Sequence, residues 1–196
     1  MKIRKTRIKQ LLKLNLLKLR VYEQFTKKTK LNDFVDSNLN QIVVNIKKVL
    51  QIIFQYHKAE KRILFVGLPY ELEQKINQLT KHVAVPKNFD IQGMISNFDP
   101  TVFLKSDNLN EAWSKNLSKS LLPKLSKRLD LIVLFDHEKS GSVLTESNIA
   151  KIPVVFFGTN YDSLKSPLYK VEGNFKNLLI GSDKNIFSIG LNFIFK

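Results

Sequence analysis

Residues 128–160 constrain the fold of this chain more than any other segment, because two strand-like runs flank a helical one. LIVLF at 131–135 and IPVVFF at 152–157 are continuous apolar runs, the pattern of a sheet that is buried on both faces. Between them, Val143, Leu144, Ser147 and Ala150 recur at helical spacing. A strand, a helix and a strand within about thirty residues predict a βαβ crossover and a parallel sheet covered by helices.

A second strand-helix-strand unit comes earlier in the chain. Residues 62–67 and 82–85 are expected to be strands, and Leu72, Ile76 and Leu79 mark the buried face of a helix between them. Before this unit, Asp36 or Ser37 is expected to cap a long helix that ends near residue 60. The sheet should therefore contain at least four strands, nearly all of them parallel.

The remaining segments carry weaker patterns. Residues 86–100 are polar and irregular, which predicts a loop, and residues 110–122 are expected to be helical as far as Pro123. Residues 185–195 predict a terminal helix, with an edge strand as the alternative.

Length and composition limit the class of protein. The 196 residues suit one well-buried α/β domain rather than two. The chain has no cysteine, which excludes disulfides and thiolate metal sites. No apolar run approaches the roughly 18 residues that cross a bilayer, so we expect no transmembrane segment. We also expect no metal and no cofactor, because the three histidines are not spaced as ligands.

Charge is concentrated at the amino-terminal end. The chain carries 32 Lys and Arg against 17 Asp and Glu, a formal net charge of +15. Residues 1–30 hold eleven of the basic residues and a single acidic one, Glu23. This distribution predicts a basic N-terminal arm over residues 1–35, a single α/β domain over residues 36–196, and a polyanionic partner.

Three interpretations of the leading segment compete. It could be a targeting presequence, although it has no serine before residue 21 and favours Lys over Arg. It could be a membrane-surface helix. The third interpretation, an arm that lies along phosphates and packs its apolar face on a neighbouring protein, agrees best with the rest of the chain. That apolar face comprises Ile8, Leu11, Leu12, Leu16 and Leu19.

The evidence for an enzyme is thin. Gly67 follows a strand and opens a helix, where doubly wound folds bind anions, but LFVGLPYE has neither the G-x-G-x-x-G nor the GK[ST] pattern. Asp136, His137 and Glu138 follow a strand, but a solvated turn that caps the next helix explains them. We expect no catalytic residues and no small-molecule substrate. A phosphate- or nucleotide-binding enzyme on a Rossmann-like fold is the alternative.

Nucleic-acid binding fits the charge distribution better. Lysine and arginine side chains that neutralise phosphates release counterions, and such contacts position a protein without reading sequence. The chain shows no zinc finger, aromatic RNP pattern or GXXG clamp, which suits a protein that docks on a large folded RNA. The candidate phosphate contacts are Arg4, Arg7, Lys9, Lys27, Lys28, Lys30, Lys47 and Lys48.

Several segments together resemble one family, the bacterial-type small-subunit ribosomal protein conventionally numbered two. KRILFVG at 61–67 resembles its KxILFVGT strand, and IQGMISNF at 91–98 resembles its LGGxLTNW loop. Residues 129–136 resemble PDxxxxxD, and residues 146–154 resemble KEAxxxGIPV. GTNYD and VEGN then stand where the family has VDTNxDP and IPGND. The order and spacing agree over roughly residues 42–180.

The chain also departs from the family. Phe89 and Asp90 replace an Arg-Trp pair, and Gln92 replaces the first glycine of the loop. The long helical hairpin of the family is shortened to about residues 101–127. The family's histidine-rich N-terminal segment is not recognisable, so its metal is not carried over.

The resemblance implies a flavodoxin-like parallel sheet with helices on both faces and a non-catalytic, structural role in the small ribosomal subunit. It implies small-subunit rRNA and neighbouring ribosomal proteins as partners, with mRNA near the exit as a further one. Gln92, Gly93 and Asn97 become candidate RNA contacts in the loop. The trimmed chain, rich in Lys, Asn, Ile, Leu and Phe, suggests the mitochondrial matrix, with plastid and bacterial ribosomes as alternatives.

Overall fold

A computed structural model describes most of the domain body. The described residues are 2–18, 31–86, 93–97, 121, 124–125, 127–135, 140–158, 169–173, 175 and 186–195. Side chains within the helices are described from residue 8 in the first helix and from residue 39 in the second.

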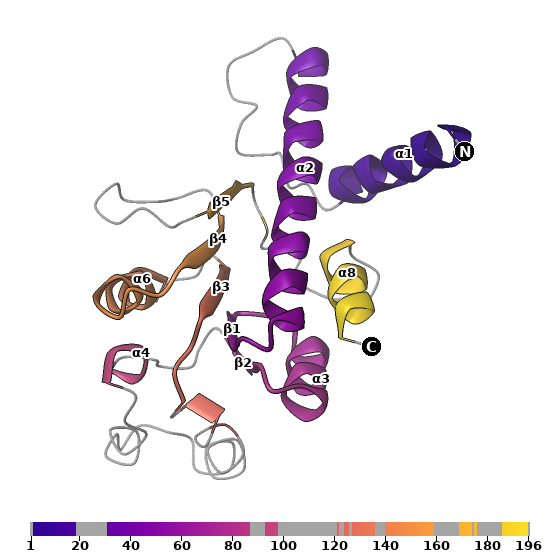
Figure 1. Ribbon diagram of the computed structural model, residues 1–196. Helices are drawn as coiled ribbons and strands as arrows, with labels where there is room; N and C mark the ends of the chain where they lie inside the picture. Colours follow the sequence, from indigo (N-terminus) through magenta and orange to yellow (C-terminus); the bar gives the residue numbers. More distant parts are fainter. Residues whose placement is uncertain are drawn as a thin grey trace.

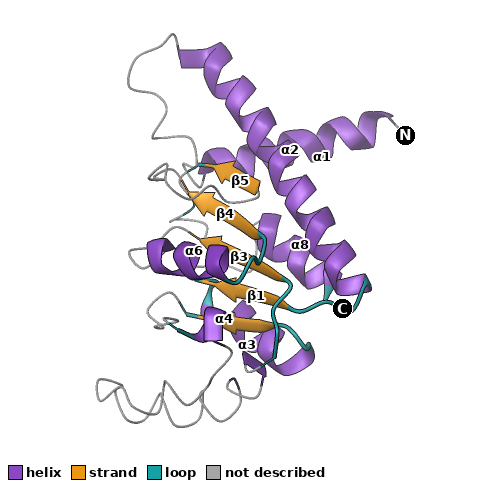
Figure 2. Cartoon of the chain, turned by 60° about the vertical axis from the view of Figure 1, so that its left-hand side comes forward, coloured by secondary structure: helices purple, strands orange, loops and turns teal. Residues whose placement is uncertain are grey.

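The centre of the structure is a five-stranded parallel sheet with the strand order β2-β1-β3-β4-β5 (Figure 2). This order is that of the flavodoxin-like doubly wound fold. The predicted α/β class and the predicted parallel sheet are therefore confirmed. The strands are β1 (Ile63–Val66), β2 (Val83–Val85), β3 (Leu131–Phe135), β4 (Val154–Gly158) and β5 (Tyr169–Glu172).

The first four strands in chain order are buried along their whole length, as a sheet covered on both faces requires. Ile63 pairs with Leu131, and Ile132 pairs with Val154. In β5 only Val171 is buried, because this strand forms one edge of the sheet.

One face of the sheet is covered by α2 (Leu31–Lys58) and α8 (Ile186–Ile194), with α3 (Tyr70–Leu79) near β2 (Figure 1). Phe187 of α8 makes edge contacts with the rings of Phe135 and Phe157, which stack on each other 4.7 Å apart. The terminal segment is thus a helix, and the alternative of an edge strand is wrong. Its apolar residues fill the space beside α2, while β5 forms the sheet edge.

The other face is covered by α6 (Ser140–Ile149) and α4 (Met94–Asn97). Val143 and Leu144 of α6 and Ile95 of α4 are buried against the alternate side chains of the strands. The prediction of an irregular loop over 86–100 therefore misses one helical turn. Residues 110–122, expected to be helical, lie outside the described residues except for Leu121.

The long helix begins earlier than its sequence suggests. α2 starts at Leu31, five residues before Asp36, and ends at Lys58. The helix therefore begins inside the segment that the sequence assigns to the arm.

The first helix is anchored on the domain. α1 (Lys2–Lys18) contacts α2, and its Leu16 is fully buried, with Leu12 and Leu17 partly buried beside it. Ile8 and Leu11 remain 56% and 65% exposed, so the predicted single apolar face is only half right. Residues that are five apart on a helix point about 140° away from each other, which is why Leu11 faces away from Leu16.

A histidine pair joins α2 to the sheet. His82, just before β2, is fully buried, and its Nε2 lies 2.8 Å from Nδ1 of His57. The Nδ1 of His82 accepts a hydrogen bond from the backbone N–H of Ile63 at 3.3 Å. A neutral ring that accepts at Nδ1 carries its proton on Nε2, so His82 donates to His57. The ring of Phe195 packs against both histidines.

Burial makes this pair sensitive to acid. Desolvation, assisted by the nearby charges of His57, Lys81 and Lys124, lowers the pKa of His82 to about 4. Between pH 6.5 and 4 the unfolded chain binds a proton that the native protein does not bind. The contribution of His82 to stability is therefore complete above pH 6.5 and is lost as pH falls towards 4.

A buried carboxyl on α3 has the opposite effect. Glu73 is 2% exposed, and burial raises its pKa from 4.5 to about 7. Between pH 4.5 and 7 the native protein binds a proton that the unfolded chain has released, so stability falls as pH rises. From pH 4.5 to 6.5 the contributions of Glu73 and His82 oppose each other.

Replacing Glu73 should remove its pH-dependent contribution to stability and leave that of His82. Glu73→Gln keeps the shape and removes the charge, so the free energy of unfolding above pH 7 should rise by about 2 kcal/mol. At pH 4.5 the variant and the wild type should be nearly equal in stability. Urea unfolding at pH 4.5 and pH 8 measures both values. Glu71→Gln, at an exposed position of the same helix, is the control, and an equal gain there would contradict the assignment.

The tautomer of His82 gives a second prediction. His57→Leu leaves the buried Nε2–H of His82 without its acceptor, which should lower the free energy of unfolding at pH 7 by about 1.5 kcal/mol. His57→Gln retains an acceptor oxygen and should lose less than half as much. Nitrogen-15 NMR of the wild-type imidazoles should find the Nε2–H form of His82. Equal losses in the two variants would show that the hydrogen bond is unimportant.

Candidate nucleic-acid interface

The carboxyl ends of the strands are where doubly wound proteins bind small ligands, so this edge was the first candidate site. Gly67 directly follows β1 and has φ = 86°, a conformation that favours glycine. Its backbone N–H donates to the carbonyl of Val85 at 3.0 Å. That N–H is therefore used to join β1 to β2 and is not directed at an anion. Asp136, His137 and Glu138 lie outside the described residues.

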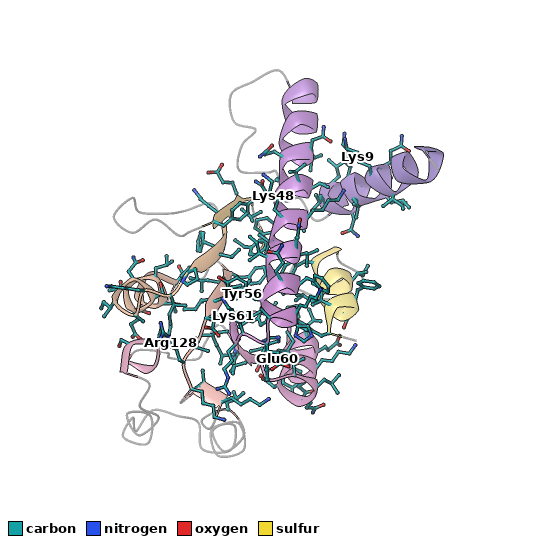
Figure 3. All side chains as sticks on the ribbon, in the orientation of Figure 1. Lys9, Lys48, Tyr56, Glu60, Lys61 and Arg128 are labelled. Atoms are coloured by element: carbon teal, nitrogen blue, oxygen red, sulfur yellow. The ribbon has the colours of Figure 1, made fainter. Side chains whose placement is uncertain are left out.

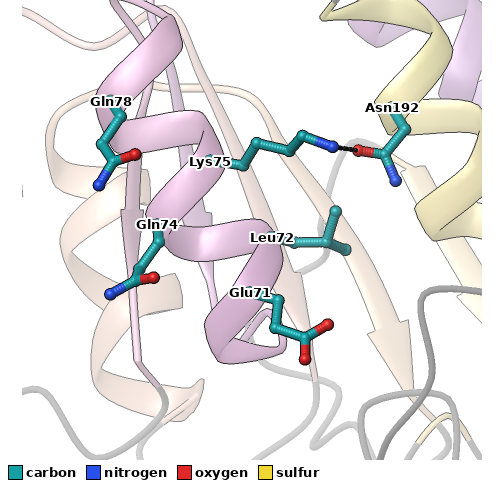
Figure 4. Close-up of a pocket in the computed structure, with 6 residues that line it drawn as sticks. All are labelled: Glu71, Leu72, Gln74, Lys75, Gln78 and Asn192. Carbon is teal, nitrogen blue, oxygen red and sulfur yellow. Dashed lines mark hydrogen bonds between the residues drawn. The ribbon is translucent and has the colours of Figure 1, made fainter.

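A shallow pocket lies between α3 and α8 (Figure 4). Its volume is about 450 Å³, and Lys75 closes one side by donating to the side-chain oxygen of Asn192 at 2.9 Å. The lining residues are Glu71, Leu72, Gln74, Lys75, Gln78 and Asn192. This set contains no hydroxyl or imidazole to act as a nucleophile or its base. Within the described ranges, no three His, Asp or Glu side chains are grouped as metal ligands.

The glycine loop is held by an acidic residue from α6. Glu146 accepts the N–H of Gly93 through one carboxylate oxygen and the N–H of Ile95, at 3.2 Å, through the other. Gly93 has φ = 80°, which explains the glycine at this position. The N–H of Gly93 is bonded within the protein, so this glycine shapes the loop. Only its carbonyl group remains as a possible hydrogen-bond partner for RNA, and its lack of a side chain would let a backbone approach closely. Gln92 is not described, and of Asn97 only the backbone is described, at the end of α4.

The sequence does not mark Glu146 as a site residue. It lies 53 residues after Gly93, and no local pattern connects the two positions. The signal that could have identified Glu146 is the hydrogen-bonding requirement of the turn that it contacts. A carboxylate satisfies two N–H groups at the start of a helical turn, and a buried turn needs such a partner.

Three candidate phosphate contacts have described side chains, and all three are exposed. Lys47 and Lys48 lie on the solvent side of α2, between the buried Ile46 and Val49. Figure 3 shows Lys48 on α2 and Lys9 on α1. Both helices belong to the same layer, on one side of the sheet. The arrangement can neutralise a polyanion but offers no means of reading its sequence.

The other candidates are less defined. Arg4 and Arg7 lie on α1, whose backbone is described at these positions while their side chains are not. Lys27, Lys28 and Lys30 fall between α1 and α2, outside the described residues. In the part of the chain that the structure covers, no helix has the length and apolar character needed to cross a bilayer.

Comparison with known proteins adds no identification: neither a family model nor a curated protein matches the chain.

Proposed function

We propose that this protein is a structural constituent of a small ribosomal subunit, which binds rRNA through phosphate contacts and supports subunit assembly. The observation that carries the proposal is a strongly basic helix fixed to a flavodoxin-like body. Of the net charge of +15, the first 30 residues contribute +10. A surplus of this kind favours a polyanionic partner of large size.

The docking of α1 supports this role. Leu16 fixes the end of the helix to α2 in the buried core, while Lys9, two turns earlier, is exposed to solvent. A lysine on an anchored helix is held at a defined distance from the domain. This restricts the geometry in which phosphates can be met, as expected of a protein that fits one place on a folded RNA.

The sites of the family resemblance support it as well. KRILFVG leads into and forms β1, residues 129–135 lead into and form β3, and residues 152–154 lead into and begin β4. The loop resembling LGGxLTNW contains α4 and the bonds to Glu146. These segments thus form one continuous part of the fold rather than scattered matches.

The proposal includes partners and a location. Small-subunit rRNA and adjacent ribosomal proteins are the main partners, with mRNA near its exit as a further contact. Ile8, Leu11 and Leu14 form an exposed apolar strip on α1 that a neighbouring protein would cover. The mitochondrial matrix is the proposed location, because the composition fits an AT-rich organelle genome. The use of the Gly67 N–H within the sheet favours this role over a nucleotide-binding enzyme.

Salt dependence of subunit binding tests the proposal. Tagged protein should co-sediment with small subunits and detach as KCl is raised. The Arg7→Gln, Lys9→Gln double variant should reduce the slope of log affinity against log salt by about 1.5, because each phosphate contact contributes roughly 0.7 to 0.9. The matched control, Lys75→Gln with Lys170→Gln, also removes two charges, but Lys75 already donates a hydrogen bond to Asn192 and Lys170 already forms an ion pair with Glu172.

Two results would overturn this function. The first is a wild-type protein that remains a free monomer when subunits are present at low salt. The second is a rise in melting temperature with inorganic phosphate or a nucleotide that Gly67→Ala abolishes, which would support the enzyme alternative.

A further inference from the structure

The turns that lead into four adjacent strands form a second basic surface, at the amino-terminal edge of the sheet. We call it the amino-edge cluster. Its members are Lys58, Lys61, Arg62, Lys81, Lys127, Arg128 and Lys151. The same turns contain two acidic residues, Glu60 and Asp130. None of these basic residues belongs to the leading segment or to the exposed pair on α2.

Strand register brings the cluster together. Ile63 pairs with Leu131 and Leu64 pairs with Val83, so the residues just before these strands, Arg62, Lys81 and Asp130, stand side by side. The backbone N–H of Asp130 donates to the carbonyl of Arg62 at 2.9 Å, which confirms this alignment. Neighbouring strands are about 4.8 Å apart, so four of them present cations over roughly 14 Å.

The register also places Lys151 in the outer row. Ile132 pairs with Val154, so Lys151 stands beside Leu129, and Lys61 stands on the other side of Leu129. Leu129 itself is buried, so no exposed apolar side chain separates the two lysines.

Both acidic residues are already engaged. Glu60 forms an ion pair with Lys81 at 3.5 Å, and the carboxylate of Asp130 accepts the backbone N–H of Arg62 at 2.8 Å. Among the described residues, Lys81 is the only cluster member that pairs with a carboxylate. Lys61, Lys127, Arg128 and Lys151 are exposed, and Figure 3 shows Lys61 and Arg128 at this end of the molecule.

Two members are partly fixed before any ligand arrives. The Nζ of Lys61 lies 5.1 Å from the ring centroid of Tyr56, a cation–π distance. One guanidinium nitrogen of Arg62, Nη1, is buried and has no hydrogen-bond partner among the described residues. Such fixed cations lose less side-chain entropy when they bind an anion.

Backbone strain marks Lys151 as unusual. Two of the helix-to-strand turns at this edge, from α2 to β1 and from α6 to β4, end in a left-handed residue, Glu60 with φ = 58° and Lys151 with φ = 54°. The N–H of Lys61 bonds the carbonyl of Tyr56, and that of Ile152 bonds the carbonyl of Ser147, so each turn is a Schellman cap. Glycine is the favoured residue at this position, because a side chain there is strained.

Lys124 lies nearby but has a different role. Its ammonium group donates to the carbonyls of Asn77 and Thr80, the latter at 2.9 Å, at the carboxyl end of α3. Burial lowers its pKa. This lysine caps a helix end, where a cation is favoured by the helix dipole, and it is excluded from the cluster.

We infer that the amino-edge cluster is a second RNA-binding surface, which holds the phosphate backbone of a duplex region. Rigid turns at fixed spacing suit a rigid ladder of phosphates. Amphipathic membrane-surface segments instead place exposed apolar residues beside their lysines, whereas Leu129 and Ile152 are buried here. The identification of this RNA as ribosomal rests on the proposed function. The inference that the surface binds RNA is independent of it.

The test measures binding of full-length protein to a labelled RNA duplex of about 20 base pairs, by fluorescence anisotropy at several salt concentrations. The Arg128→Gln, Lys151→Gln double variant should weaken binding about tenfold at 0.1 M KCl and reduce the salt slope by about 1.5. The control is Lys75→Gln with Lys170→Gln. Equal weakening by the control would overturn the inference, because it would show attraction to total charge alone.

A second pair of variants distinguishes the charge of Lys151 from its role in the backbone turn. Lys151→Gly relieves the left-handed strain, so its melting temperature should rise by about 2 °C while RNA affinity falls. Glu60→Gly relieves the same strain at the matching turn, so its melting temperature should rise while RNA affinity is kept or increased. Unchanged RNA affinity in Lys151→Gly would assign Lys151 a structural role only and sink the inference.

Two other outcomes decide between partners. Vesicles of phosphatidylserine and phosphatidylcholine serve as the second probe. If the Arg128→Gln, Lys151→Gln variant loses vesicle binding but keeps duplex binding, the surface binds lipid and the RNA assignment fails. If the wild type binds the duplex through this cluster but does not sediment with small subunits, the ribosomal function fails and the RNA surface stands.

Discussion

Four of the five described strands, β1 to β4, carry apolar side chains on both faces, so neither face of the sheet is stable in contact with water. Leu64 and Phe65, adjacent in β1, are both fully buried although they point to opposite sides. Helices must therefore cover both faces of the sheet. Because the strands are parallel, the chain must return from the end of one strand to the start of the next through these helices. Each strand then begins at one common edge and ends at the opposite one, which fixes where every loop can contribute to a site.

Much of this architecture could be predicted from the sequence because it depends on local periodicity. The apolar runs around Val133 and Val155 could only be interior strands, and the helix between them followed from spacing. Element starts were less predictable. α2 begins at Leu31, five residues before the expected cap at Asp36, because residues that suit a cap also occur within the first turns of helices and do not mark the start uniquely.

The contacts that shape the candidate interface could not be predicted in the same way. Glu146 and Gly93 are 53 residues apart, and His57 and His82 are 25 apart; neither pair leaves a local pattern. The amino-edge cluster is divided among four short turns, each with only one to three basic residues. The high density of positive charge arises only when the register of the strands brings these turns together. In contrast, the basic leading segment is contiguous and is evident from composition alone.

The attachment of α1 has a consequence for the order of assembly. The helix is held through its last two turns, around Leu12 and Leu16, while its amino-terminal end extends away from the sheet in both ribbon views. A helix of 17 residues is about 25 Å long, so its tip lies well outside the globular body. The exposed Lys9 on this projecting part therefore lies outside the helices that cover the sheet, so a polyanion of the kind proposed above would contact the helix before it contacts the body.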